Sequence, residues 1–200
     1  EKPARRSGEQ VRGFFPTAIR DGHLAMMSVA AVCGSGFAAM NTFFPLHAKN
    51  LGYQAGAFFL CYGISLVLVR VFLGALADSI SREKLIFYCI IGFGVLLFGT
   101  SHLASLSQTV LLGAIFGLVQ GLSYPAMMAR MVDRSSEGNR AVVVSLFTGS
   151  FGVGINVSVL GWGYIANKEG LSAMFFIGGV LMLAAATIFF WRFMVPKPRR

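Results

Sequence analysis

The sequence predicts an all-α membrane protein with six transmembrane helices and both termini in the cytoplasm. Only 12% of its 200 residues are charged and 56% are hydrophobic, whereas about a quarter of the residues in a soluble domain are charged. Four long windows contain no Asp, Glu, Lys or Arg. Because about 20 apolar residues cross a bilayer as a helix, each window is long enough to span a membrane. These windows are residues 22–48, 85–129, 141–167 and 170–191.

The first two helices are predicted at 24–47 and 55–77. The first lies within an uncharged window and ends before Lys49, and the second carries Arg70 as its one charged residue. An arginine facing lipid at mid-helix costs about 3 kcal/mol on insertion scales. We therefore expect Arg70 to face protein or water, with snorkelling of its side chain to the headgroups as the alternative.

The third and fourth predicted helices, 85–103 and 110–131, share one uncharged window that is too long for a single span. The polar segment TSHLASLSQT, residues 100–109, divides this window. In the fourth helix, glycines recur at every fourth position over 113–121, and they therefore lie on one face. Such glycines let a neighbouring helix approach closely and predict a helix contact.

The fifth and sixth helices are predicted at 141–166 and 171–193. The fifth is rich in glycine, which also indicates close packing, and the sixth is almost wholly apolar. Pro45 late in the first helix and Pro125 late in the fourth predict bends toward opposite membrane faces. An inverted repeat of three plus three helices would place them in this way.

Lysine and arginine are divided unequally between the two sides of this arrangement. All but three of the 17 fall in the leader, in the connections after the second and fourth helices, or in the tail. The exceptions are Lys49 and Lys168 in the opposite connections and Arg70 within a helix. Because cytoplasmic loops are enriched in these residues, the rich side is predicted to be cytoplasmic. An even number of helices also places both termini on one side.

The chain is therefore divided into a basic cytoplasmic leader at 1–22, a bundle at 23–194 and a basic cytoplasmic tail at 195–200. Topology accounts for the net charge of +9, so nucleic acid is not expected as a partner. The three cysteines lie in apolar stretches at spacings that fit neither a zinc site nor a disulfide framework. We expect no metal and no cofactor. Because the chain begins with Glu1, we expect a fragment or a processed form.

The stretch RVFLGALADSISREK, residues 70–84, combines charged residues with an apolar helix end. Arg70, Gly74 and Asp78 recur at intervals of four and fall near one helix face. The run from Gly74 to Asp78, followed by Arg82 and Lys84, resembles the loop signature of major facilitator superfamily transporters. In that family the signature lies between the second and third helices of each six-helix half.

This copy departs from the family signature at three positions. Ser79 stands where the family often has arginine, Ser81 replaces its glycine, and Glu83 interrupts the basic run. The resemblance continues in GLSYPAMMARMVDRSSEGNRA (121–141), which is similar to the end of the tenth helix and its loop in bacterial members. The glycine-rich fifth helix resembles helix eleven, and the leader resembles the loop joining the two halves. The whole chain thus resembles the C-terminal half of such a transporter.

The resemblance implies a gate at the cytoplasmic ends of the helices. Asp78 would brace a helix of the other half when the transporter is open to the outside, and Arg82 would pair with Asp133. The alternative interpretation is that these charges mark topology and cap helices. The candidate gating residues are Arg70, Gly74, Asp78, Arg82, Lys84 and Asp133.

The resemblance also implies that the first, second, fourth and fifth helices line a solute pathway, while the third and sixth face lipid. Polar side chains on the four lining helices are the candidates. The alternative is that they form hydrogen bonds to neighbouring helices, which are typically worth less than about 2 kcal/mol. The candidates are Asn41, Tyr62, Arg70, Gln120, Tyr124 and Asn156.

Transport of a small solute by alternating access is the function that this resemblance implies, and an enzyme is not expected. Export of an amphipathic compound or metabolite across a bacterial inner membrane is favoured, with an N-terminal six-helix half as partner in the same chain or another. No Asp, Glu or His lies at mid-membrane, so the coupling ion stays open. The alternative is a six-helix homo-oligomeric channel or scaffold that needs no second half.

Overall fold

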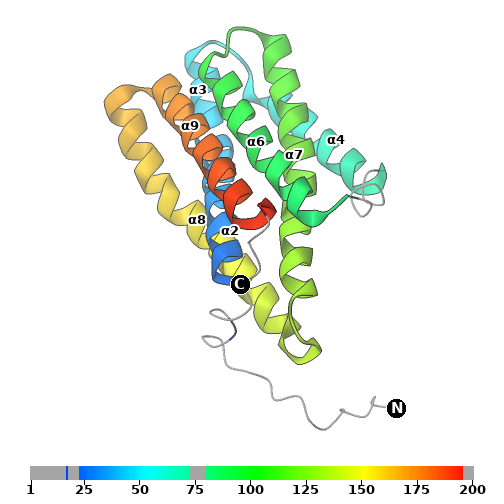
Figure 1. Ribbon diagram of the computed structural model, residues 1–200. Helices are drawn as coiled ribbons and strands as arrows, with labels where there is room; N and C mark the ends of the chain where they lie inside the picture. The colour runs from blue at the N-terminus through cyan, green and yellow to red at the C-terminus, as the bar shows by residue number, and fades with distance from the viewer. Residues whose placement is uncertain (1–16, 18–22, 73–79, 196–200) are drawn as a thin grey trace.

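The computed structural model describes residue 17, residues 23–72 and residues 80–195 (Figure 1). The described chain is a bundle of helices, as predicted. The elements are α2 (His23–Ala38), the π-helical turn η2 (Ala39–Phe43), α3 (Phe44–Asn50), α4 (Ala55–Phe72), α6 (Arg82–Ser101), α7 (Leu106–Asp133), the 3-10 turn η3 (Glu137–Asn139), α8 (Arg140–Glu169), α9 (Leu171–Phe189) and the π-helical turn η4 (Phe190–Met194).

Six stretches of this bundle are long and apolar enough to cross a membrane, which confirms the predicted number of spans. Of the predicted second helix, residues 73–77 lie outside the described residues. The stretches are His23–Asn50, Ala55–Phe72, Arg82–Ser101, Leu106–Asp133, Glu137–Glu169 and Leu171–Met194.

The turn between the third and fourth spans is shorter than the predicted polar segment at 100–109. The helix α7 begins at Leu106, because Ser105 caps it by accepting a hydrogen bond from the backbone N–H of Gln108 (3.1 Å). The Gln108 side chain reaches back and accepts from the backbone N–H of Ala104 (2.9 Å). This arrangement is close to a capping box, so polar residues that resemble a loop instead begin a helix.

The first span is continuous from His23 to Asn50, but its regular winding is interrupted by η2 just before Pro45. Proline removes one helical hydrogen bond and its ring crowds the carbonyl four residues earlier. A wider π-helical turn relieves that crowding. At Pro125, by contrast, α7 continues as an α-helix.

The helices pack in three pairs that cross between the first and second halves of the chain. The most extensive contacts join α2 with α8, α4 with α7, and α6 with α9. If the first three spans are exchanged with the last three in order, α2 corresponds to α7, α4 to α8 and α6 to α9. Under this exchange the α2–α8 pair becomes the α7–α4 pair, and the α6–α9 pair is unchanged. This pattern agrees with the inverted repeat that the two prolines predict.

Glycines allow two of these pairs to approach backbone to backbone. A Cβ atom added at Gly113 or Gly117 of α7 would meet backbone atoms of α4, so the predicted contact face is confirmed. At Gly34 of α2 and Gly154 of α8, an added Cβ would meet the backbone of the other helix. Carbonyl groups of one helix therefore occupy the space that a side chain on the other would need.

Glycines that face open space occur on α4 and α8 and distinguish these two helices from the other described helices. Among the described helices, only these two contain glycines with no atom within 4 Å of an added Cβ. They are also the least covered spans, with 11% of the α4 window and 28% of the α8 window buried, against 39–56% for the others. The glycines with open space are Gly56 and Gly63 on α4 and Gly149, Gly152 and Gly161 on α8.

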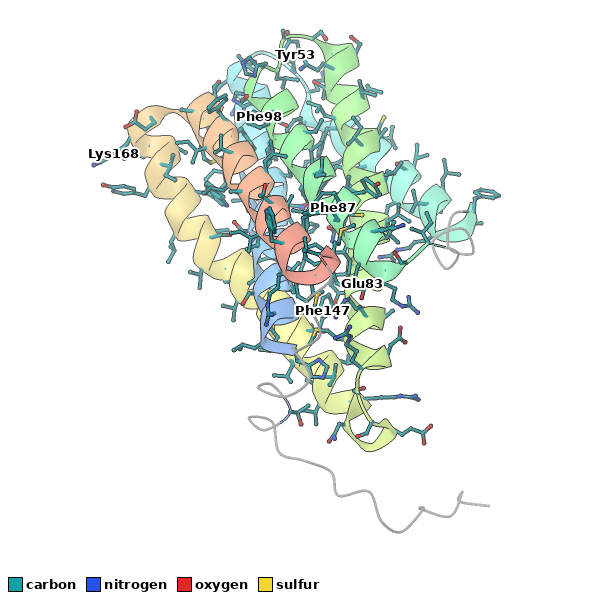
Figure 2. All side chains as sticks on the ribbon, viewed as in Figure 1. Tyr53, Glu83, Phe87, Phe98, Phe147 and Lys168 are labelled. Carbon is teal, nitrogen blue, oxygen red and sulfur yellow. The ribbon has the colours of Figure 1, made fainter. Side chains whose placement is uncertain are left out.

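One end of the bundle, here called the Tyr53 end, contains the turns at 51–54, 102–105 and 170 (Figure 2). The Tyr53 hydroxyl donates to the carbonyl oxygen of Ala104, which joins two of these turns. The opposite end, here called the Arg130 end, contains the start of α6 and the end of α7.

Candidate functional site

An aromatic cluster centred on Phe116 of α7 lies in the interior of the bundle. The Phe116 ring is fully buried and lies 4.6 Å from the Tyr62 ring and 5.7 Å from the Phe58 ring, both on α4. Phe37 of α2 lies 5.8 Å away and Phe93 of α6 lies 6.3 Å away. One side chain of α7 thus contacts three other helices.

A second group of rings surrounds Tyr124, two turns further along α7. The Tyr124 ring lies edge-on to Phe147 at 4.9 Å and to Phe151 at 5.2 Å, both on α8. Phe37 lies 5.9 Å from Phe151 and so connects this group to the rings around Phe116. The two groups form one aromatic cluster along the interior face of α7.

Two buried polar oxygen atoms of α7, on residues close in sequence to Phe116 and Tyr124, have no hydrogen-bond partner within the described chain. Gln120 is one turn from both Phe116 and Tyr124 and is 7% exposed, and Ser123 is 1% exposed. Within the described part of the chain, Gln120 Oε1 and Ser123 Oγ are buried and accept or donate no hydrogen bond. A buried polar group left in this state costs about 1–3 kcal/mol, so these atoms are free to interact with a polar group of a solute.

Of the six predicted pathway residues, Tyr62, Gln120 and Tyr124 lie in this cluster. Asn41 and Asn156 instead bond to their own helices: Asn41 Nδ2 donates to the Phe37 carbonyl (3.3 Å) and Asn156 Nδ2 to the Gly152 carbonyl (2.8 Å). Asn156 is exposed on the little-covered side of α8.

Arg70 lies in the last turn of α4 and is exposed. It takes part in no ion pair between described residues, and α4 itself is the least covered span. Its side chain therefore points away from this bundle, toward a neighbouring protein surface, water or the lipid headgroups.

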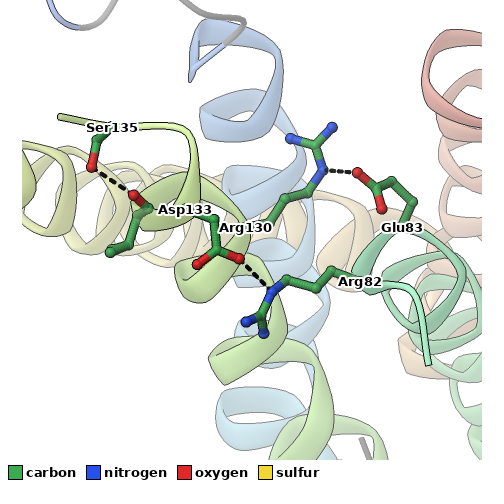
Figure 3. A network of polar contacts seen from close by, with 6 residues as sticks. Arg82, Glu83, Arg130, Asp133 and Ser135 are labelled. Atoms are coloured by element: carbon green, nitrogen blue, oxygen red, sulfur yellow. Dashed lines mark hydrogen bonds and ion pairs between the residues drawn. The ribbon is translucent and has the colours of Figure 1, made fainter. Parts of the chain in front are cut away.

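At the Arg130 end, two ion pairs join the start of α6 to the end of α7 (Figure 3). Arg82 Nε donates to Asp133 Oδ2 at 2.6 Å, which is the contact that the sequence predicts. Arg130 Nε donates to Glu83 Oε1 at 3.0 Å. Neighbouring residues on each helix therefore have opposite charges and bond across to the other helix.

The two pairs differ in their surroundings. The Arg82 and Asp133 side chains are 36% and 55% exposed, whereas those of Arg130 and Glu83 are 6% and 31% exposed. The Arg130 guanidinium also lies 4.8 Å from the centre of the Phe193 ring in η4, a cation–π contact. Arg130 thus ties the end of α9 to α6 and α7, while the Arg82–Asp133 pair remains accessible to solvent.

The other predicted gating residues are not part of this described network. Lys84 is exposed on α6. Gly74 and Asp78, which carry the family signature, lie outside the described residues.

Sequence reasoning missed several residues of both sites. Glu83 is a departure from the family signature and Arg130 is one of several basic residues in its connection, so neither is distinctive alone. Phe147 and Phe151 recur at an interval of four, as Phe116 and Gln120 do, and that spacing was the available signal. Which interior faces meet depends on helix pairing, which the spacing does not specify.

Comparison with known proteins identifies the family. A sequence profile of the Major Facilitator Superfamily matches residues 24–200. The multidrug resistance protein MdtG of Dickeya zeae is 27% identical over 171 residues, which cover 80% of this chain and 41% of that protein. The inner membrane transport protein YajR of Escherichia coli is 29% identical over 133 residues, which cover 65% of this chain and 28% of that protein.

An uncharacterized transporter of Buchnera aphidicola is 27% identical over 139 residues, which cover 68% of this chain and 34% of that protein. No solved structure matches the chain. In all three comparisons with curated relatives, the matched part of the chain spans less than half of the relative's length. With six membrane-spanning helices and a family match over nearly its whole length, this integral membrane protein belongs to the major facilitator superfamily, a family of transporters rather than enzymes.

Proposed function

We propose that this chain is the C-terminal half of a transporter that moves a small solute across the membrane by alternating access. Family membership supports membrane transport as the general activity. The observation that supports a half-transporter is the placement of the open glycines. Within the described helices, the glycines with no neighbour within 4 Å of an added Cβ all lie on α4 and α8, the two least covered spans.

A second six-helix bundle would pack along these two helices. Glycine without a neighbour presents bare backbone, against which another helix can pack closely. The helices α4 and α8 are equivalent under the exchange of the first and last three spans, so a partner with the same internal pattern would meet both in the same way. The other four spans cover one another more fully and leave less surface for a partner.

The solute would bind where the aromatic cluster reaches the surface of this bundle, at the half-buried Tyr62 and Tyr124, between this bundle and the second one. Tyr62 and Tyr124 supply aromatic surface, and Gln120 Oε1 with Ser123 Oγ supply polar groups that the described chain leaves without partners. Aromatic walls with few polar groups suit an amphipathic solute. Asn41, Asn156 and Arg70 are candidates nearer the edges of the pathway.

The ion pairs at the Arg130 end would form part of the cytoplasmic gate. The Lys/Arg distribution supports placing this end and both termini in the cytoplasm. The solvent-accessible Arg82–Asp133 pair, together with Lys84, Gly74, Asp78 and Arg70, is positioned in the sequence where the family signature predicts gating. The Arg130–Glu83 pair, in which Arg130 is buried and Glu83 half-buried, would hold α6, α7 and η4 together as one rigid unit during the motion.

Export of amphipathic compounds or metabolites from the cytoplasm of a bacterium is the direction we favour. The MdtG relative is named a multidrug resistance protein, and YajR is named an inner membrane transport protein. These names support a location in the inner membrane and an export function for the complete protein.

The test compares this chain alone with the full-length protein containing six preceding helices, each reconstituted in liposomes. We expect efflux of a fluorescent amphipathic dye only from full-length protein, and the variant Gln120→Leu should reduce it. Dye flux through this chain alone, above empty-vesicle leak, would contradict the half-transporter and favour the alternative of a homo-oligomeric channel. Cross-linking of two copies of this chain through α4 and α8 would support that alternative.

A further inference from the structure

An apolar groove of about 350 Å³ lies between α2 and α9 at the Arg130 end of the bundle. Val29 and Val32 of α2 form one wall, Ile188 and Phe189 of α9 form the other, and Ile90 of α6 also lines it. The wall formed by α2 runs over residues 25–32, which corresponds to about 10 Å along the helix axis. The helix α9 lies beside α6 at the front of the bundle in Figure 1. The described residues that line the groove include none from α7, so the groove is separate from the interior face of α7.

The groove has a cation at one end. Arg192 of η4 lines it, whereas the hydroxyl group of Ser28 on α2 already donates to the carbonyl oxygen of Leu24 (3.1 Å). Arg192 is exposed, and the ion pairs of the described residues do not include it. Its guanidinium therefore has five donors that fit the oxygen atoms of a phosphate group.

The position of Arg192 along the bundle matches the headgroup level of a bilayer. The preceding residue, Trp191, is 68% exposed at the end of the last span. Tryptophan is enriched at membrane–water interfaces, because its ring is apolar and its N–H is polar. Toward the membrane centre, by contrast, the groove is lined by apolar side chains such as Ile188, which is 69% exposed.

The shape of this end of the groove is fixed by contacts already described. The π-helical turn η4 places Phe193 beside Phe189, with ring centres 4.7 Å apart. The buried Arg130 of α7 lies over the Phe193 ring, with its guanidinium carbon 4.8 Å from the ring centre. Both phenylalanines line the groove. The part of the groove beside Arg192 is therefore bounded by two contacting rings, one of which also contacts Arg130 of α7.

A second groove provides a natural comparison. It has a volume of about 390 Å³, lies between α6 and α9, and is lined by Phe87, Ile91, Leu183, Ala186, Thr187 and Phe190. It is similar in size and apolar character to the first groove, but none of its lining residues is charged.

We propose that the groove between α2 and α9 binds an anionic phospholipid, with one acyl chain along Val29, Val32 and Ile188 and the phosphate group held by Arg192. Apolar walls fit the chain, and the unpaired cation at the headgroup level selects the negative charge. The assignment to the cytoplasmic leaflet rests on the orientation proposed above, but the lipid assignment does not. The site would tie the end of α9 to the surrounding membrane.

The test places a photoreactive benzoylphenylalanine in each groove of the full-length protein, as Ile188→benzoylphenylalanine or Thr187→benzoylphenylalanine. Vesicles contain equal amounts of phosphatidylglycerol and phosphatidylethanolamine, and cross-linked lipids are quantified by mass spectrometry. At position 188 we expect about a fivefold preference for phosphatidylglycerol, the ratio that corresponds to one cation near the membrane surface. At position 187 we expect no preference.

Arginine variants separate the groove from general surface charge. Arg192→Gln should abolish the preference at position 188 and Arg192→Lys should retain most of it. Arg140→Gln removes an exposed arginine at the start of α8, outside the groove, and should leave the preference unchanged.

Four outcomes would overturn the proposal. These are equal labelling of both lipids at position 188, a preference that survives Arg192→Gln, an equal preference at position 187, and cross-linking to a polypeptide segment instead of lipid. Because the measurement needs no solute flux, its failure is distinguishable from a failure of the proposed transport function.

Discussion

At the scale of single residues, the two arginines at the Arg130 end have different energetic roles. Arg130 is buried and bonds to Glu83, while Arg82 is partly exposed and bonds to the more exposed Asp133. Removing one member of a buried pair leaves the other without compensation, whereas an exposed pair contributes about 0–1 kcal/mol.

We therefore predict that Arg130→Gln lowers the free energy of unfolding by about 1–3 kcal/mol, because Glu83 loses its partner and Phe193 its cation. Arg82→Gln should change it by less than about 1 kcal/mol. Thermal unfolding of the full-length protein in detergent measures both. Equal losses for the two variants would contradict the distinction. The exchange Arg130→Glu with Glu83→Arg should recover part of the loss.

Gln120 presents the opposite case, a buried polar side chain with an unsatisfied oxygen. Replacing such a group by an apolar one of similar size removes a desolvation cost. We predict that Gln120→Leu leaves the unfolding temperature unchanged or higher while solute efflux decreases. Thermal unfolding and liposome flux on the same preparation check this. A lower unfolding temperature with unchanged flux would show that Gln120 is structural only.

Residue patterns predicted part of this site. The spacing of Phe116, Gln120 and Tyr124 indicated one helix face, and these residues do lie along the interior of the bundle. Their ring partners Phe37 and Phe151 come from helices distant in sequence, and a period within one helix contains no information about such pairing. The Arg82–Asp133 contact was predictable only because the family resemblance supplied it.

At the scale of elements, the glycines of α8 divide into two kinds. Gly154 faces the backbone of α2, whereas Gly161 has no neighbour within 4 Å of an added Cβ. The sequence predicted close packing from the whole glycine-rich helix, but within the described bundle only part of it packs in this way. Composition identifies a helix that can approach others closely, and the angular position of each glycine decides which one does.

We predict that Gly154→Ala lowers the free energy of unfolding by about 1–3 kcal/mol, because the added methyl group forces α2 and α8 apart. Gly163→Ala is the matched control on the same helix, because its added methyl group would meet only the Phe43 ring at an ordinary contact distance of 3.8 Å, and it should have little effect or a small stabilising one, since alanine favours helix. Thermal unfolding of both variants is the measurement. A similar loss at both positions would indicate that helix contact is not the cause.

The ends of the elements were less predictable than their number. The apolar segments between the charged and polar connections predicted six spans, because the hydrocarbon core excludes charge over a fixed length. The start of α7 was misplaced, because Ser105 and Gln108 are polar in a loop and equally polar as a helix cap. Capping depends on backbone geometry, which composition does not report.

At the scale of the whole molecule, the predicted topology makes a sharp claim about accessibility. Arg134 follows α7 at the Arg130 end, and Lys168 lies in the last turn of α8 at the Tyr53 end. We predict that Arg134→Cys is labelled by an impermeant thiol reagent only from the cytoplasmic side and Lys168→Cys only from the opposite side. Labelling of both from one side would contradict the topology.

The crossed pairing of helices has a consequence for synthesis. Gly34 of α2 packs against α8, and α4 packs against α7, so the first three spans leave the ribosome before their main partners exist. Until α8 is inserted, the bare backbone at Gly34 meets lipid or an insertion factor. Chains arrested before residue 140 should therefore remain sensitive to proteases and quality control, however well each helix has entered the bilayer.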